Sequence, residues 1–346
     1  MLDKIFNACV KYKVIIYAVV SIFAIIFPLV FTSAYAIRIG TVCLMYIMLA
    51  LSLNLLTGVM GQMSFGHAAF WGVGAYTAAI LSTRMGFGTE LNILAAVIIC
   101  GIFGLLVGLP VLKLSGAYLT LVTLGFCEII RMVELNWMDL TRGPLGIARI
   151  PKPSFFGIDL KTSLAIYFLI FVLMLITLYI VKSLIDSKFG RAIKAIRDDD
   201  IAAASMGVNV FKTKVIVFVV SSMLAGVAGA FYAQYIGYID PSSFTTNASL
   251  EILIMVIFGG LGSIVGTIFG SVFLIVLPEL LRGLMEYRML IYGILIVVLM
   301  LVKPTGLFGN INFKYIEQRL RAHKDDEPDA ALPDKKKKVK KAGIEQ

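Results

Sequence analysis

The chain is poor in charged residues, which make up 15% of its 346 positions, while apolar residues make up 59%. A soluble globular domain carries roughly 25% charged and roughly 45–50% apolar residues. The apolar excess is arranged in blocks of about 18–22 residues, the length that a helix needs to cross the hydrocarbon core of a bilayer. This composition excludes an ordinary soluble domain and predicts an all-α polytopic membrane protein.

Cysteine, histidine and catalytic motifs are also scarce. The cysteines are Cys9, Cys43, Cys100 and Cys127. They show no paired spacing, and the only other histidine besides His67 is His323 in the tail, so we predict neither a disulfide framework nor a metal site. No glycine-rich phosphate-binding loop, HExxH motif or serine elbow occurs. We therefore expect no enzyme activity, no cofactor, and no ATP bound by this chain itself.

The net charge of +10 does not indicate a nucleic-acid partner, because much of it lies in the C-terminal tail. Residues 335–338, 340 and 341 are all lysine. A solvated basic tail beside an anionic inner leaflet explains this placement.

We predict about ten transmembrane helices. Their bounds are 14–31, 39–57, 64–82, 91–109, 117–135, 163–181, 215–234, 250–266, 267–284 and 289–302. Basic residues concentrate near the N-terminus, in the loop at 182–214 and in the tail, which predicts that both chain ends face the cytoplasm. The chain then divides into a transmembrane domain, 1–302, with a cytoplasmic loop at 183–212, and a basic tail, 303–346, that we expect to be largely disordered.

The polar loop is the most unusual segment, because a charged helix between membrane spans must face water. Arg191, Lys194 and Arg197 recur every three residues as a basic stripe. Three aspartates at 198–200 then open an alanine-rich helix, where carboxylates suit the positive helix end, and Gly207 is placed to end that helix. An ordinary solvated connector needs no such charge segregation. We therefore interpret the loop as a handle, that is, a docking site through which another protein moves this chain.

Polar residues inside two predicted spans are candidates for a solute pathway. They are Ser64, His67, Tyr118, Thr120 and Thr123. A polar group inside a membrane span faces a partner or a wet cavity. The alternative is that these groups are hydrogen-bonded within the core.

Glu128 and Arg131 lie three residues apart in the fifth span and can pair on one helix face. Such a pair could satisfy itself near the outer interface, or it could lie along a polar solute route. Gly116 and Gly125 could open breaks in the same span that expose backbone groups.

Glycines recur every four residues in the eighth and ninth spans, at Gly262, Gly266 and Gly270, with Gly259 just before them. Small residues on one helix face allow close helix packing in lipid. Static packing and helices that rock around a pathway are both compatible with this pattern.

Several segments together resemble the permease subunit of branched-chain amino-acid ABC importers, of the larger M type. They are 61–76 (GQMSFGHAAFWGVGAY), 116–125 (GAYLTLVTLG), 143–147 (GPLGI), 190–199 (GRAIKAIRDD), 202–207 (AAASMG), 240–244 (DPSSF), 259–263 (GGLGS) and 306–309 (GLFG). The resemblance covers about residues 40–310, and the joint set is specific although each segment alone is not.

The resemblance implies a helical permease of the ABC importer type in a bacterial inner membrane. It implies a second homologous permease, two cytoplasmic ATPase subunits, a periplasmic solute-binding protein and a small amino-acid solute. The segment corresponding to the ATPase-coupling helix then comprises Gly190, Arg191, Arg197, Asp198, Asp199, Ala202, Ala203, Ser205 and Gly207.

The chain departs from the family pattern in the outer loop, where Arg142 stands at a usual glycine and Leu145 at a position that is commonly polar. Related permeases also carry urea and short amides, so the solute stays open. An ion-coupled secondary carrier is a further alternative, but such carriers usually bury several ionisable groups at mid-membrane, and few occur here.

Overall fold

The computed structural model describes residues 27–28, 33–114, 116–155, 158–160, 162–280, 293–294, 297 and 306–307. All of them belong to one compact unit, 23–310. The predicted first and tenth spans fall almost entirely outside the described residues, as do the basic tail and the boundary at residue 302. The count of ten spans therefore stays a prediction.

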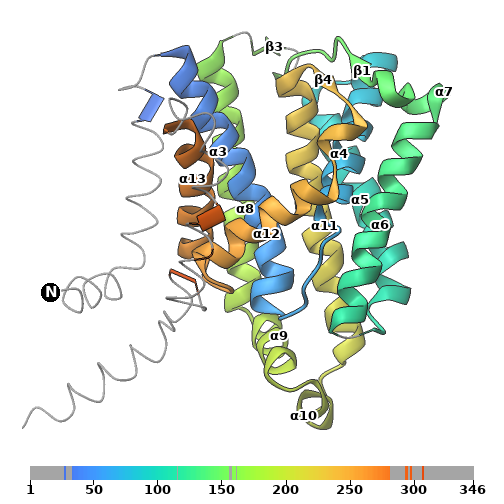
Figure 1. The fold of residues 1–346 in the computed structure, drawn as a ribbon, viewed down its shortest axis with the longest axis vertical. Helices are drawn as coiled ribbons and strands as arrows, with labels where there is room; N and C mark the ends of the chain where they lie inside the picture. Colours follow the sequence, from blue (N-terminus) through green and yellow to red (C-terminus); the bar gives the residue numbers. More distant parts are fainter. Residues whose placement is uncertain are drawn as a thin grey trace, which may run out of the picture. The chain divides into compact units, whose positions relative to one another are not determined.

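The predicted spans from 39–57 to 267–284 each fall on a described helix (Figure 1). These helices are α3 (Ala34–Leu53), which continues into the π-helical segment η1 (Asn54–Val59), α4 (His67–Arg84), α5 (Thr89–Val111), α6 (Ala117–Asn136), α8 (Ser163–Asp186), α11 (Val210–Ile236), α12 (Thr246–Gly259) and α13 (Ile264–Leu280). Five stretches of the described chain are long and apolar enough to cross a membrane: 34–59, α5, α8, α11 and 241–259.

Most predicted spans differ from the described helices by a few residues at their ends, and glycines lie beside two of these differences. The third span begins at His67 rather than residue 64, because the chain from Gly61, at φ +78°, to residue 66 is not helical. The eighth ends at Gly259 rather than residue 266, because Gly260 and Gly262 adopt positive φ angles of 115° and 82°. Glycine adopts this backbone region at little cost, so it ends a helix readily.

Helix α11 lies at the centre of the described chain and packs mainly against α4 and α5. The contact with α4 is close because both helices present small residues. A methyl group at Gly74 would collide with the carbonyl of Gly226, and one at Gly229 would collide with the carbonyl of Trp71. Small residues therefore bring these two helix backbones together, as expected for packing in lipid.

The two ends of the helix stack differ (Figure 1). One end, here called the α10 end, carries the short helices α9 (Lys188–Asp198) and α10 (Asp200–Ser205). The other, the β end, carries α7 (Met138–Thr141), three-residue helices η2 (Gly143–Leu145) and η3 (Pro241–Ser243), and the strands β1 (Ile147–Ala148), β2 (Ser154–Phe155), β3 (Ile158–Asp159) and β4 (Tyr238–Ile239). Strands β1 and β4 pair antiparallel, with Ile147 opposite Ile239, and β2 pairs with β3.

Helix α5 shows which kind of surface this chain turns outward. Its exposed side chains form an apolar stripe that includes Leu94, Ile98, Leu105 and Leu106. Such a stripe needs no water, so it suits contact with lipid tails or with another apolar helix.

Candidate functional site

Helix α9 is amphipathic, and its turn from α8 requires a glycine. Ile193 and Ile196 are buried against the helix stack, while Arg191 and Lys194 of the basic stripe lie on the outer side. The Ser187 hydroxyl caps the helix by accepting a hydrogen bond from the Gly190 N–H at 3.1 Å. A methyl group at Gly190 would collide with the carbonyls of residues 184 and 185, so no larger residue fits this turn.

Helix α10 begins at the aspartates, as the sequence indicates. The Asp199 carboxylate accepts hydrogen bonds from the N–H groups of Ile201 and Ala202, both at 2.9 Å. Two N–H groups that the helix leaves unpaired are thereby satisfied. Gly207, at φ +83°, ends the helix and donates to the Ala204 carbonyl at 2.9 Å.

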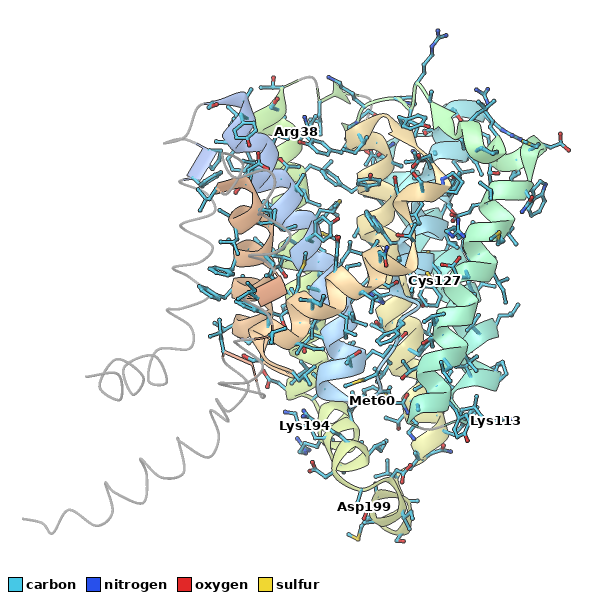
Figure 2. All side chains as sticks on the ribbon, in the orientation of Figure 1. Arg38, Met60, Lys113, Cys127, Lys194 and Asp199 are labelled. Carbon is cyan, nitrogen blue, oxygen red and sulfur yellow. The ribbon has the colours of Figure 1, made fainter. Side chains whose placement is uncertain are left out.

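The face of α10 that points away from the chain carries two large apolar side chains, which the sequence analysis did not single out. Ile201 is 78% exposed and Met206 is 85% exposed, whereas Ala203 is 4% exposed and faces the chain itself. A helix of six residues is too short for its periodicity to reveal this face. Asp199 lies at the very tip of this end (Figure 2).

Arg197 links α9 to two distant parts of the helix stack. Its guanidinium donates to the carbonyl oxygen of Gly58, in η1, at 2.6 Å. The N–H of Gly262, in the turn between α12 and α13, donates to the Asn54 side-chain oxygen in η1 at 2.8 Å. A methyl group at Gly262 would lie 3.1 Å from the Arg197 guanidinium. Arg197, η1 and the α12–α13 turn therefore form one contact, here called the Arg197 junction.

Lys214 links α10 to α11. Its side chain is largely buried and pairs with the Asp200 carboxylate at 3.3 Å, whereas the Asp200 side chain is 49% exposed. Because ion pairs with an exposed member contribute about 1 kcal/mol or less, this pair orients α10 more than it stabilises the fold.

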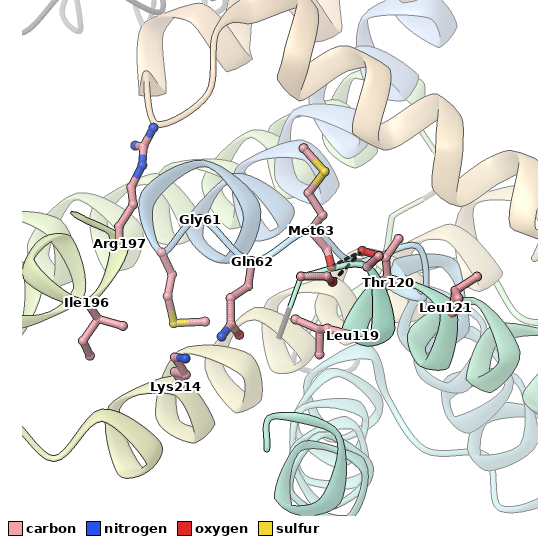
Figure 3. A pocket seen from close by; sticks show the side chains of 12 residues that line it. Gly61, Gln62, Met63, Leu119, Thr120, Leu121, Ile196, Arg197 and Lys214 are labelled. Carbon is pink, nitrogen blue, oxygen red and sulfur yellow. Dashed lines mark hydrogen bonds between the residues drawn. The ribbon is translucent and has the colours of Figure 1, made fainter. Parts of the chain in front are cut away.

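A pocket of about 730 Å³ opens beside these links. Its lining residues are Met60, Gly61, Gln62, Met63, Gly116, Ala117, Leu119, Thr120, Leu121, Ile196, Arg197 and Lys214. Figure 3 shows the side chains of Gln62 and Lys214 on one side of it and Thr120 on the other. The pocket thus joins the polar loop to a predicted pathway residue.

The predicted pathway residues separate into two groups. Tyr118 is 72% exposed and Thr120 lines the pocket, whereas Ser64, His67 and Thr123 are buried. The ring nitrogen Nε2 of His67 lies 2.6 Å from the Ser52 hydroxyl, and the Thr123 hydroxyl accepts from the residue 65 N–H at 3.1 Å. The buried group holds the segment 60–66 in place, and its contact with a solute stays a prediction.

Glu128 and Arg131 form the pair that their spacing permits, with 2.8 Å between the guanidinium and a carboxylate oxygen. The other carboxylate oxygen accepts a hydrogen bond at 2.6 Å from the Thr246 hydroxyl, at the start of α12. Sequence reasoning found the pair but missed Thr246, because 118 residues separate it from Glu128.

The recurring glycines bring α12 and α13 together. A methyl group at Gly259 would collide with the Gly266 carbonyl, and one at Gly270 would lie 2.5 Å from the Met255 carbonyl and 2.9 Å from the Gly259 nitrogen. Gly262 lies in the turn instead. The two helices therefore meet backbone against backbone.

Among the described residues, no group of three His, Cys, Asp or Glu side chains could hold a metal ion. Cys43, Cys100 and Cys127 are buried free thiols. The described residues interact through hydrogen bonds, ion pairs and close helix packing.

Comparisons with known proteins match most of the chain. The family model described as "Branched-chain amino acid transport system / permease component" matches residues 35–300. The high-affinity branched-chain amino acid transport system permease protein LivM of Salmonella typhimurium is 35% identical over 330 residues, covering 89% of this chain and 77% of that protein. LivM of Escherichia coli is 34% identical over 330 residues, which again cover 89% of this chain and 77% of that protein.

A second group of relatives carries a different name. The permease protein LivH of Escherichia coli is 23% identical over 283 residues, covering 76% of this chain and 91% of that protein. No solved structure gives a significant match. With its long apolar helices and this family match, the chain is a multi-pass integral membrane protein. It belongs to the family of permease components of branched-chain amino acid transport systems.

Proposed function

We propose that this chain is the transmembrane permease subunit of an ATP-binding-cassette importer that moves branched-chain amino acids across the bacterial inner membrane. The support is its similarity to LivM and LivH, two permease proteins whose names assign them to one kind of transport system. Because two different permease proteins, LivM and LivH, carry the name of the same kind of transport system, we propose a second, homologous permease as the partner of this chain. Two cytoplasmic ATPase subunits and a periplasmic solute-binding protein complete the proposed complex.

The α10 end faces the cytoplasm in this proposal. Lys113, Lys188, Arg191, Lys194 and Lys212 lie at or beside that end, on α9 or at the ends of α5 and α11. Basic residues beside membrane spans favour the cytoplasmic side. Arg38, Arg84, Arg142, Arg149 and Lys152 lie at the β end and are the exception to this asymmetry.

The observation that carries the proposal is the Arg197 junction. An ATPase that moves α9 and α10 would pull on η1 and on the α12–α13 turn through the bond from Arg197 to Gly58. Both contacted parts are breaks in regular α-helix, where a backbone can change its course at low cost. Movement would therefore pass from the cytoplasmic handle to two membrane elements and favour alternating access.

The pocket suits the cytoplasmic mouth of the solute route. It lies between α9, the segment 60–66 and the start of α6, and Thr120 and Gln62 supply polar groups to a wall that is otherwise mainly apolar. An amino acid with an aliphatic side chain needs both kinds of surface. Tyr118, on the same turn of α6, is strongly exposed but does not line the pocket.

The test is transport by the complete complex in proteoliposomes, with both permeases, the ATPases and the soluble receptor. We expect ATP-dependent uptake of labelled leucine that requires the receptor. Uptake of urea without uptake of leucine would overturn the solute assignment. Uphill leucine uptake by the permeases without the ATPases would overturn the mechanism.

A second measurement tests the orientation. A Ser205→Cys variant places a thiol on α10, where the residue is exposed. We expect a membrane-impermeant thiol reagent to label it in inside-out vesicles and not in intact spheroplasts. Labelling in spheroplasts would place the handle on the wrong side of the membrane.

A further inference from the structure

Two charged side chains in the second half of α6 are partly exposed, Glu128 eight residues and Arg131 five residues before the helix ends at Asn136. Glu128 is the twelfth residue of α6, which puts it about 16 Å from the helix start at about 1.5 Å per residue. The Glu128 side chain is 37% exposed and that of Arg131 is 24% exposed. Cys127, the neighbour of Glu128, lies between the two ends of the stack (Figure 2).

This face of α6 does not suit lipid. Charged side chains inside membrane spans are costly, and they face a bundle interior or a water-filled cavity. Helix α12, which starts beside Glu128, adds exposed Asn247 and Glu251 to the outward surface of the chain. The exposed neighbours of the pair on α6, Ile129 and Met132, are apolar like the outward stripe of α5, so the charged pair itself sets this face apart. The α6–α12 face therefore borders the solute route or the second permease.

Glu128, Arg131 and Thr246 form a cluster in which a negative and a positive side chain lie next to each other. One Glu128 carboxylate oxygen accepts a hydrogen bond from the Arg131 guanidinium, and the other accepts one from the Thr246 hydroxyl. Because the Arg131 bonds described here use Nε and one terminal nitrogen, the guanidinium keeps further N–H donors that make no bond to a described residue. The α12 start adds the positive end of a helix dipole next to the carboxylate.

A gap in the α6 surface lies one turn away from Glu128. A methyl group built at Gly125 meets nothing within 4 Å. Gly125 and Leu121 precede Glu128 by three and seven residues, so all three share one side of the helix, and Leu121 is 63% exposed. Charged groups, an open notch and an apolar side chain therefore follow one another along α6.

We propose that Glu128, Arg131 and Thr246 bind the charged backbone of an α-amino acid in the solute route. The Glu128 carboxylate receives the ammonium group and the Arg131 guanidinium receives the carboxylate, while the aliphatic side chain lies over Gly125 against Leu121. A zwitterion that exchanges partners with this pair keeps every charge compensated during passage. The inference rests on the proposed transport of amino acids and adds the contacting residues.

The first test uses the complete importer in proteoliposomes and labelled leucine. We expect Glu128→Gln and Arg131→Gln to reduce uptake at least tenfold, with assembly of the complex retained. Glu90→Gln and Lys113→Gln are matched controls away from the cluster and should transport like the unmodified chain. Uptake within twofold of the unmodified complex in both cluster variants overturns the site. If the unmodified complex itself moves no leucine, the proposed function fails instead.

A charge exchange separates binding from a merely structural pair. The double variant Glu128→Arg with Arg131→Glu keeps one positive and one negative group on the same helix face but reverses their order. We expect the complex to assemble and leucine uptake to stay at least tenfold reduced, because the zwitterion then meets like charges. Recovery of uptake to the unmodified level would show that only pairing matters and would overturn the proposal.

Protection from a thiol reagent gives a readout independent of transport rate. Thr246→Cys is made in a chain with Cys9→Ala, because the described native cysteines are buried. We expect leucine to slow labelling at position 246 in the receptor-bound complex, and not to slow labelling of a Ser242→Cys control at the exposed β end. Equal labelling rates of the Thr246→Cys variant with and without leucine contradict the site.

Discussion

The guanidinium of Arg197 donates a hydrogen bond at 2.6 Å to the carbonyl oxygen of Gly58, which lies 139 residues earlier in the chain. The bond ties the water-facing helix α9 to the π-helical end of a membrane helix. Hydrogen bonds from charged donors contribute about 1.5–3 kcal/mol, enough to hold two elements in register while one of them is pushed.

Arg197→Ala is expected to uncouple ATP hydrolysis from transport. The variant keeps α9, whose buried contacts come from Ile193 and Ile196, but removes the link to Gly58. Loss of a bond of about 1.5–3 kcal/mol corresponds to a fall in coupled uptake of about tenfold or more. Uptake and ATPase activity are measured on the same proteoliposomes, with Lys113→Ala as the control. A parallel fall in both activities would instead indicate lost ATPase docking.

Charged residues on the apolar face of α10 are expected to prevent ATPase docking. Ile201→Glu with Met206→Glu places carboxylates where two strongly exposed apolar side chains stand. Burying an unpaired carboxylate in an interface costs several kcal/mol, so co-purification of the ATPases should be lost. Leu145→Glu at the β end is the control, because Leu145 is as exposed as Ile201. Normal co-purification of the double variant would show that the ATPases bind elsewhere.

Asp199→Ala is expected to loosen α10 without unfolding the membrane domain. The carboxylate caps two N–H groups of the helix, and losing such a cap costs about 1 kcal/mol, or about a fivefold rise in local opening. Hydrogen–deuterium exchange of residues 200–206 measures this opening. Asp198→Ala is the control, since the Asp198 side chain makes no hydrogen bond to any residue in the described part of the chain. Unchanged exchange in Asp199→Ala would mean that the cap contributes nothing in solution.

Gly259→Ala is expected to destabilise the helix stack. The added methyl group collides with the Gly266 carbonyl, and backbone cannot rotate aside as a side chain can. Overpacking of this kind costs about 1–3 kcal/mol, which lowers the melting temperature of the purified protein. Gly293→Ala is the matched control, because a methyl group there meets nothing within 4 Å. Equal melting temperatures for the two variants would contradict the close α12–α13 contact.

Local signals in the sequence predicted most of the described helices and the loop at the α10 end. Apolar blocks indicated the spans, and the run of aspartates indicated the start of α10. The ion pair of Glu128 and Arg131 also follows from local spacing. These features depend on residues within one or two helical turns, so one sequence suffices to infer them.

The contacts between distant segments could not be predicted in this way. No local sequence pattern indicates that Arg197 bonds to Gly58 or that Thr246 bonds to Glu128, because hydrophobic periodicity describes one helix at a time. His67 is a comparable case, since the hydroxyl that satisfies it belongs to Ser52 on the preceding helix. The outward turn of Ile201 depends on how α10 rests on α11, which is a tertiary effect.

The glycine contact between α12 and α13 has a mechanical consequence. Where backbone touches backbone, no layer of rotatable side chains can absorb a displacement. The hairpin therefore behaves as a stiff lever, with one arm at Gly262 beside Arg197 and the other at Thr246 beside Glu128. In the proposed importer, a tilt applied at the Gly262 arm would reach the charged pair of α6 with little loss, so a small movement of the ATPases would change the contacts that this pair makes with a passing solute.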